Sequence, residues 1–552
     1  MNIEHVEKSY QELESDSTLQ NLIAQANARY ILYNTEESKE NFPRYTIKDE
    51  QLNILAFKYL NIGCNYFSEH NYLKASHSLE KGALILEYIH GSIHIQTKNK
   101  KLFCLISALS YYVCFQYSKA FILIGKLESD TMISSLVSLF LNRKFDQLLS
   151  EIDKLITNSS YGDEYLAEHF EEDNATKIYE IIIAKSLNYY VQFYQTGNKD
   201  FLEIAKKDLV NLQEVAAMRG EPDVWWVIRL LLLIIDGFKE SSLWYVLGNY
   251  FNTEDKLPLK YIQSLVYKNG SITELFLTQR NSLPKVLNNK QGSIVSIPTS
   301  SGKTRIGEIA ILNCLLNEPK AKILFIAPYR SLAYEIENSF DEIFSNLDVS
   351  VSHLYGGSLF SKLDERIIDE SSVIVATPEK AKALFRSNED ILSCIKLVII
   401  DEGHLLGTDK RLIVNEMFYE ELKYHVKANG GRFLLLSAVL PNAEDLSEWL
   451  TDSTDNVYKE NWRPSDERIG IMEWNGVSVN LNWKSTDAER NSFNPNFIMR
   501  QKLPKKPKER IMHYFPENKN QAIASTAYKL RKFGPVLIFV GIKKSVLRQI
   551  WW

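Results

Sequence analysis

The sequence lacks the cysteine patterns that hold small folds together or bind metal ions. Its five cysteines are odd in number and scattered, and no two of them form a Cys-x-x-Cys pair. That pattern argues against a disulfide framework and against a zinc site, and it favours a reducing cytoplasm. Glycine and proline are also scarce, with 23 and 15 among 552 residues, which excludes a low-complexity chain. We expect a folded cytoplasmic protein.

Long apolar runs and an excess of positive charge are absent as well. No basic segment with an apolar stretch behind it follows Met1, so no secretory signal is expected. The most apolar run, Val224–Ile235, is interrupted by Arg229 and falls well short of the roughly 20 residues that a membrane span needs. We therefore expect no membrane partner. The net charge of −5 leaves any nucleic-acid binding to a local groove rather than to the field of the whole molecule.

The chain is long enough for two or three domains, because single hydrophobic cores stop growing at about 250 to 300 residues. Residues 1–268 consist of amphipathic segments with little glycine, proline or β-branched clustering, which predicts an all-helical N-terminal region. The spacing of a tetratricopeptide helix hairpin is present at Tyr59, Ile62, Gly63, Tyr66, Ala75 and Leu79. A partial repeat places Ala120 45 positions (120 minus 75) after Ala75, which exceeds the usual period. An irregular stack of helix hairpins and a plain helical bundle both remain open.

Beyond residue 269, short apolar runs alternate with helix-length segments, which predicts a mostly parallel sheet with helices on both faces. The runs are Ser293–Ile297, Lys322–Ala327, Val349–His353, Val373–Ala376, Leu397–Ile400 and Phe433–Leu436. The helical pattern is interrupted between Glu254 and Ser271, where we expect limited proteolysis to cut first.

The first of these runs leads directly into a glycine-containing loop and then into a helical stretch, Arg305–Leu316. Strand, loop and helix in that order are the context that a phosphate-binding loop requires. Backbone N–H groups and the helix N-terminus would surround a β-phosphate, Lys303 would neutralise charge on the β- and γ-phosphates, and the Thr304 hydroxyl would bind Mg²⁺. Ile297 stands where the usual pattern begins with glycine. The candidate ATP-binding residues of this loop are Pro298, Thr299, Ser300, Ser301, Gly302, Lys303 and Thr304.

A second apolar run, Val398–Ile400, emerges into the adjacent carboxylates Asp401 and Glu402, 98 positions (401 minus 303) after the lysine. The ends of parallel strands are where Mg²⁺ and water chemistry belong. Asp401 would hold Mg²⁺ through its water shell, and Glu402 would take the proton from the attacking water. His404 would report the nucleotide state to a neighbouring segment. With Lys303, these residues form the candidate catalytic set.

These motifs and several others resemble, in order and spacing, a superfamily 2 helicase of the DExH type, closest to the Ski-like group, over about residues 276–540. Gln279 resembles the glutamine that reads adenine. Three segments resemble those that line a nucleic-acid track; their candidate contacts are Arg330, Gly356, Gly357, Thr377 and Pro378. Ser437 and Ala438 resemble the segment that couples hydrolysis to strand movement, although this chain has Val439 where the family more often has threonine. Asn461–Pro464 resembles the Ski-like signature that closes the first motor domain.

The resemblance implies an α plus α/β architecture. An ATP-binding RecA-like domain would span residues 269–465, a linker residues 466–533, and the start of a second RecA-like domain residues 534–552, with a strand at Pro535–Val540. ATP and Mg²⁺ would be the cofactors, single-stranded DNA or RNA the partner bound without regard to sequence, and a protein could bind the helical region. Within 466–533, the basic stretch Lys502–Arg510 is interpreted as a solvated linker rather than a binding patch.

The same resemblance implies that most of the second motor domain is missing. A deliberately shortened chain, a frameshifted gene and a naturally truncated product are the explanations that remain open. We therefore expect weak or no unwinding by this chain alone. A non-catalytic module that binds nucleotide, nucleic acid or protein is the alternative to an ATP-driven helicase. The helical front end together with Pro298–Thr304 and Leu436–Pro441 is also similar to helicase subunits of bacterial antiphage systems of the Hachiman type.

Overall fold

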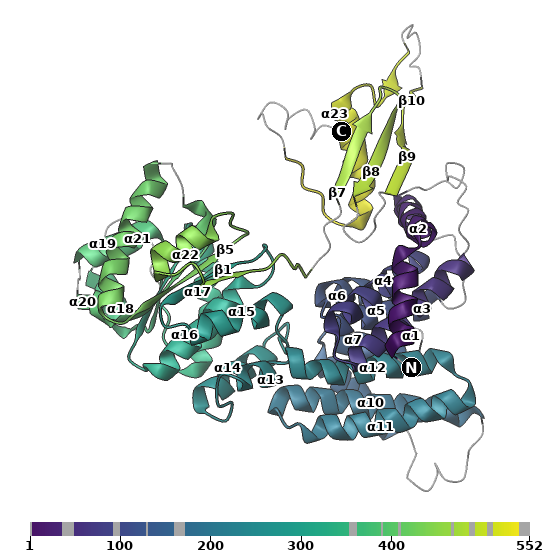
Figure 1. Cartoon of the computed structure of the whole chain (residues 1–552), viewed down its shortest axis with the longest axis horizontal. Coiled ribbons are helices and arrows are strands. Elements are labelled where there is room, and N and C mark those ends of the chain that lie inside the picture. The colour runs from purple at the N-terminus through teal and green to yellow at the C-terminus, as the bar shows by residue number, and fades with distance from the viewer. Residues whose placement is uncertain are drawn as a thin grey trace.

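A computed structural model describes most of the 552 residues (Figure 1). The described ranges are 3–35, 49–91, 100–127, 131–158, 172–352, 362–387, 390–406, 410–464, 469–484, 492–504 and 512–539. Gly356 and Gly357, predicted to contact nucleic acid, lie outside them. Among the described residues, no helix has both the length and the apolar character needed to cross a membrane.

Helices make up the described part of the N-terminal region, as predicted (Figure 1). In chain order they are α1 (Ile3–Ser15), α2 (Ser17–Thr35), α3 (Asp49–Ser68), α4 (Tyr72–His90), α5 (Lys100–Val113), α6 (Tyr117–Ile124), α7 (Met132–Leu141), α8 (Phe145–Asn158), α10 (Glu172–Thr196), α11 (Asp200–Arg219), α12 (Pro222–Ser241), α13 (Leu243–Gly248) and α14 (Lys256–Val266). The predicted hairpin is α3 and α4. A Cβ placed on Gly63 would lie 2.6 Å from the Leu79 side chain, so the small residue permits the close crossing of the two helices.

The α/β part is a six-stranded parallel sheet in the order β3-β2-β4-β5-β1-β6. Its strands are β1 (Gly292–Ser296), β2 (Lys322–Ile326), β3 (Val373–Ala376), β4 (Ile395–Ile400), β5 (Arg432–Ser437) and β6 (Val457–Lys459). Five of the predicted apolar runs are strands. The sixth, Val349–His353, is not: Val351 makes a single parallel bridge to Val373, and residue 353 lies outside the described ranges.

Helices cover both faces of this sheet, because successive strand residues point to opposite faces and both sets are apolar. The two faces form two separate hydrophobic cores. They are α15 (Leu277–Asn288), α16 (Lys303–Asn317), α17 (Arg330–Phe344), α18 (Lys362–Glu370), α19 (Pro378–Ser387), α20 (Asp390–Cys394), α21 (Lys410–Ala428) and α22 (Ala443–Thr451). Phe325 shares one core with Phe340 of α17, and that core continues into the helical region. Leu324 shares the other core with Phe418 of α21.

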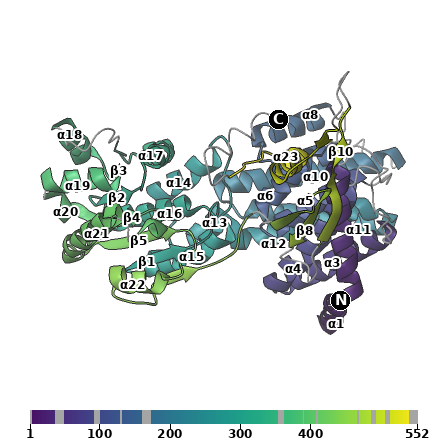
Figure 2. The same cartoon turned by 90° about the horizontal axis from the view of Figure 1, so that it is seen from above.

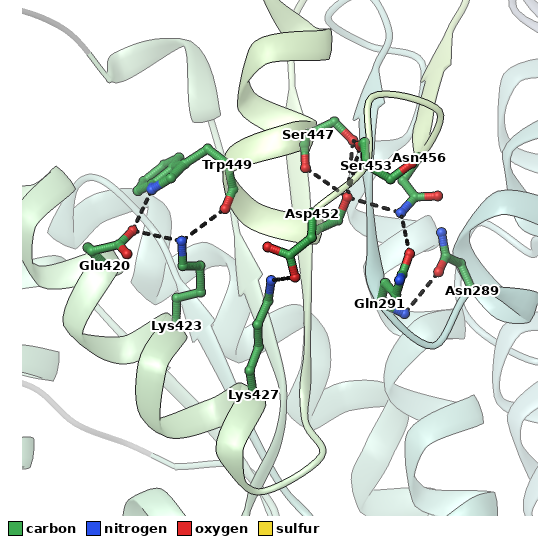
Figure 3. A network of polar contacts seen from close by, with 11 residues as sticks. Asn289, Gln291, Glu420, Lys423, Lys427, Ser447, Trp449, Asp452, Ser453 and Asn456 are labelled. Carbon is green, nitrogen blue, oxygen red and sulfur yellow. Dashed lines mark hydrogen bonds and ion pairs between the residues drawn. The ribbon is translucent and has the colours of Figure 1, made fainter.

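A polar network lies near the amino-terminal ends of β1, β5 and β6, away from the strand ends where catalytic residues are predicted (Figure 3). Lys423 donates to the backbone oxygen of Trp449 at 3.1 Å and pairs with Glu420 at 2.9 Å, which ties α22 to α21. The Asn456 amide donates to Thr451 at 3.0 Å. These contacts fix the C-terminal helix of the sheet domain in place.

The segment expected to be a linker, residues 466–533, contains regular structure. It has an antiparallel sheet of β7 (Ile469–Trp474), β8 (Ser478–Lys484) and β9 (Ser492–Met499), a short pair of β10 (Gln501–Lys502) and β11 (Tyr514–Phe515), and α23 (Lys519–Leu530). This sheet lies beside α2 (Figure 1), where the Asn494 amide donates to the Ala28 backbone oxygen at 2.9 Å.

The strand expected at Pro535–Val540 is not formed in its described residues, 535–539, which have no regular secondary structure. Their side chains are exposed, 88% in the case of Phe539, so they lack the neighbouring strands that would stabilise an apolar strand.

Candidate functional site

The predicted phosphate loop lies between β1 and α16 and enters the helix through a glycine. Gly302 has φ 77° and ψ 41°, in the left-handed region, and α16 begins at the next residue, Lys303. A residue with a side chain would be strained at this φ, and its Cβ would displace the Gln279 amide, which would lie 2.1 Å away. Pro298 and Ser301 are buried, whereas Thr299 and Ser300 are exposed. A helix N-terminus next to a partly exposed loop is an arrangement that can bind an anion, as the prediction requires.

Gln279, predicted to read adenine, lies against this loop. Its Oε1 accepts the Phe276 N–H at 2.8 Å, and its Nε2 donates to the Gly302 backbone oxygen at 3.0 Å. The neighbouring Thr278 hydroxyl donates to the Ser301 backbone oxygen at 3.3 Å. The start of α15 is therefore tied to the phosphate loop at two successive residues.

The predicted catalytic residues come together at the carboxyl ends of β1 and β4. The Lys303 Nζ lies 3.2 Å from Glu402 Oε2, and His404 Nδ1 lies 3.1 Å from the same oxygen. Glu402 has φ 52° and ψ 48°, a left-handed conformation that is rare for a residue with a side chain and is concentrated at functional sites. Its N–H donates to Asp401 Oδ1 at 2.9 Å.

Asp401 is 9% exposed. Burial, and next the nearby Glu402 carboxylate, raise the pKa of the Asp401 carboxyl to about 6. A cation beside Asp401 would favour its charged form, and the oxygen donors of Thr304 and Asp401 are of the kind that Mg²⁺ takes from proteins. The residues present therefore fit Mg²⁺ carried in with a nucleotide.

The predicted coupling segment contacts the catalytic residues through His404. The Ser437 Oγ accepts the His404 N–H at 2.9 Å and lies 3.4 Å from the ring Nδ1. The Ala438 backbone oxygen accepts a hydrogen bond from the Ser296 hydroxyl at 3.4 Å, and Ser296 Oγ also accepts the Leu440 N–H at 2.9 Å. Sequence reasoning missed Ser296, whose only signal is a buried hydroxyl in an apolar strand.

The described candidates for nucleic-acid contact lie at the same edge of the sheet. Arg330 is the exposed first residue of α17, after β2. Thr377 follows β3 and accepts the Lys380 N–H at 3.4 Å at the start of α19. Pro378 helps to line a cavity of about 250 Å³ that also reaches Asp401 and Glu402. The structure thus brings these three residues to the carboxyl ends of neighbouring strands.

Trp462, in the segment that closes the sheet domain, also reaches the phosphate loop. Its backbone oxygen accepts the Ser301 hydroxyl at 3.4 Å, and its ring centroid lies 6.0 Å from that of Phe276. The sequence of Asn461–Pro464 predicts only a signature that closes the domain, and no local pattern indicates its contact with the loop.

Residues 277–446 match the family model of the DEAD/DEAH box helicases. This stretch is a DEAD/DEAH box helicase domain. The helicase domain so defined contains β1 to β5 together with Gln279, Lys303, Asp401, Glu402 and Ser437.

The whole chain is similar to Hachiman protein HamB of Bacillus cereus, with 40% identity over 556 aligned residues that cover all of this chain and 49% of HamB. The chain thus spans about half the length of that relative. ATP-dependent DNA helicase Hel308 of Thermococcus kodakarensis is 33% identical over 218 residues, covering 40% of this chain and 18% of Hel308. Among solved structures, DUF1998 helicase MrfA bound to DNA matches with a TM-score of 0.31 and 19% identity, over 36% of this chain and 29% of MrfA.

Proposed function

We propose that this chain is the ATP-binding part of an ATP-driven helicase or translocase motor that moves on single-stranded nucleic acid. The observation that carries the proposal is the contact chain from Lys303 through Glu402 and His404 to Ser437. It joins Lys303, at the end of the proposed phosphate loop, to Glu402 and then to Ser437 of the proposed coupling segment. A change at the γ-phosphate would therefore be passed through direct contacts to the carboxyl end of β5.

The roles of the residues follow from their positions. The Lys303 ammonium lies 3.2 Å from Glu402 Oε2, and in the proposed site it would bind the β- and γ-phosphates of ATP. Glu402 would then accept the proton of the attacking water. Thr304 and Asp401 would hold Mg²⁺, which when bound would neutralise phosphate charge.

Arg330, Thr377 and Pro378 support a track for nucleic acid at the same sheet edge. An exposed guanidinium, a hydroxyl and backbone N–H groups at strand ends grip phosphates without reading bases, which is what a motor that moves along any sequence needs. The alternative is a module that binds nucleotide or nucleic acid without catalysis. The presence of both Glu402 and Lys303 in contact favours the motor.

The test of the ATP-binding assignment is a titration of a fluorescent ATP analogue in Mg²⁺ with the wild type, Lys303→Ala and Glu402→Gln. We expect Lys303→Ala to weaken binding at least about tenfold, because a charge-assisted phosphate contact is lost. Glu402→Gln should retain binding. Equal affinity of the wild type and Lys303→Ala would overturn the assignment of Pro298–Thr304 as the phosphate loop.

We further propose, on the similarity to Hachiman protein HamB along the whole chain, that the motor works in a Hachiman-type antiphage system. Replacing the gene with the Lys303→Ala variant in its host should abolish protection against phage. Unchanged protection in a plaque assay would contradict this role.

A further inference from the structure

Glu274 is a buried carboxylate that the nucleotide site does not use. Only 2% of its side chain is exposed, and it lies between α14 and α15. Its Oε1 accepts the hydroxyls of Tyr117 at 3.1 Å and Ser241 at 2.8 Å. Its Oε2 accepts the Tyr112 hydroxyl and lies 3.7 Å from the Arg143 guanidinium. A buried charge is costly unless it is paired and hydrogen-bonded, and here the partners come from four separate parts of the helical region.

The backbone around Glu274 is held by the same helices. The Leu275 N–H donates to the Ser241 backbone oxygen at 2.8 Å, and the Leu243 N–H donates to the Thr273 backbone oxygen at 3.0 Å. These two bonds form a short antiparallel bridge between the end of α12 and the segment before α15. The segment is therefore attached to the end of α12.

Two residues beyond Glu274, the chain reaches the nucleotide site. The Phe276 ring lies 6.2 Å from the Tyr117 ring, nearly parallel to it, and 6.0 Å from the Trp462 ring. The Phe276 N–H holds Gln279, whose amide donates to the Gly302 backbone oxygen. A continuous set of bonds and ring contacts thus runs from the helical region to the phosphate loop.

We propose that Glu274 is a positioning residue through which the helical region holds Phe276 and Gln279 against the phosphate loop and so sets the adenine preference of the site. The inference rests on the proposed ATP-binding function. With glutamine in place of Glu274, Arg143 loses its ion-pair partner, and the hydroxyls that now share two carboxylate oxygens are left with one acceptor oxygen and an NH2 donor. The segment before α15 would then loosen, and Gln279 would no longer be fixed on Gly302. By linkage, a partner that moves α5, α6 or α12 would change nucleotide affinity, and nucleotide would change the affinity for that partner by the same factor.

The test measures the dissociation constants of fluorescent ATP and GTP analogues, in Mg²⁺, for the full chain. We expect Glu274→Gln to weaken binding of the ATP analogue at least about fivefold while binding of the GTP analogue changes little, so that the dissociation constant for GTP divided by that for ATP, the adenine preference ratio, falls. Gln279→Ala should lower the ratio similarly, and the double variant should lower it no further than either single variant, because both changes disable one path. Tyr117→Phe, which keeps the ring against Phe276, gives the same change in smaller measure and replaces Glu274→Gln if that variant does not fold.

The matched control is Glu308→Gln. Glu308 is also a buried carboxylate between the helical region and the helicase domain, paired with the Tyr261 hydroxyl and Arg305, but it lies outside residues 274–279. It should lower thermal stability without changing the ratio. A parallel loss of both affinities in Glu274→Gln, or an unchanged ratio, would overturn the inference. If Lys303→Ala binds as the wild type does, it is the ATP-binding proposal that fails instead.

Discussion

Asp401 is a carboxylate that the fold buries beside a second carboxylate. Because the pKa of Asp401 is raised to about 6, a proton competes with a metal ion for it below that pH. We expect the affinity for an Mg²⁺–ATP analogue to fall as the pH drops through about 6, measured by titrations at fixed Mg²⁺. Asp401→Asn should bind weakly with a flat profile over that range. A flat profile in the wild type would contradict a role of this carboxylate in holding Mg²⁺.

The same pKa shift has a consequence for stability without nucleotide. An acid whose pKa is raised by folding, here from 3.8 to about 6, binds more protons in the folded state between those values, so the folded state loses stability as the pH rises through that window. Asp401→Asn removes this cost and should stabilise the chain without nucleotide near neutral pH by roughly 3 kcal/mol. Urea unfolding near pH 7 and near pH 4 tests this, since the gain should nearly vanish at the lower pH.

Gly403, between Glu402 and His404, is required for packing. A Cβ there would lie 2.7 Å from the side chain of buried Leu435. Gly403→Ala should therefore destabilise the chain by roughly 1–3 kcal/mol through overpacking, measured by urea unfolding. Gly248→Ala is the control, because the nearest atom to its Cβ would be 3.8 Å away. Equal midpoints for the two variants would contradict this reading of Gly403.

At the scale of single residues, sequence reasoning could propose those site residues that stand in a recognisable local motif. Lys303 follows a glycine in a loop, and Asp401 and Glu402 end an apolar strand, so local sequence was enough to propose them as a site, and the structure brings Lys303 and Glu402 into contact. The bonds of Ser296 and Trp462 were out of reach, because they join positions 142 and 161 residues apart. Such contacts are fixed by strand order and by the return of the chain to the site, which no local pattern encodes.

At the scale of elements, the sequence predicted strands that are buried on both faces and missed those that are not. β2 to β5 lie inside the sheet or against covering helices and form near-continuous apolar runs. β6 has three residues, none fully buried, at the edge of the sheet. β7 has exposed Ile469 and Ile471 on one side, and glycine and proline nearby blur its pattern. Its place in the sheet depends on pairing with β8 rather than on its own composition.

Helix α14 shows how the helical region is attached. Tyr261 is fully buried, and its hydroxyl donates to Glu308 on α16 at 3.2 Å. Tyr261→Phe would leave a buried carboxylate with one donor fewer and should lower the free energy of unfolding by roughly 1–3 kcal/mol. Tyr267→Phe is the matched control, because Tyr267 is 62% exposed and follows the same helix. The same loss in both variants, measured by urea unfolding, would contradict the importance of this contact.

At the scale of the whole molecule, the helical region and the helicase domain share one continuous core, and α13 and α14 lie between them (Figure 2). The boundary expected between Glu254 and Ser271 therefore falls on a packed helix, because Pro258 and Leu265 are buried there. First cleavage at that boundary stays a prediction, and the packing of α14 argues against it. The sequence showed where the helical pattern is interrupted but not that both sides of the interruption would be covered.

The described residues contain one parallel-sheet motor domain, and a translocating motor needs two that close on ATP and open after hydrolysis. Exclusion of water and neutralisation of charge in the transition state both require a facing domain, and an arginine from such a domain is worth about 10³ to 10⁵ in rate. We therefore expect the 552-residue chain to bind an ATP analogue but to show little hydrolysis stimulated by nucleic acid and no unwinding.

A protein extended to the length of HamB, of which this chain covers 49%, should hydrolyse ATP rapidly with single-stranded DNA or RNA. Glu402→Gln should abolish that turnover while leaving binding intact. The measurement is phosphate release, compared for the two lengths with and without nucleic acid. Robust stimulated turnover by the 552-residue chain, lost in Glu402→Gln, would show that this parallel-sheet domain hydrolyses ATP without a second domain.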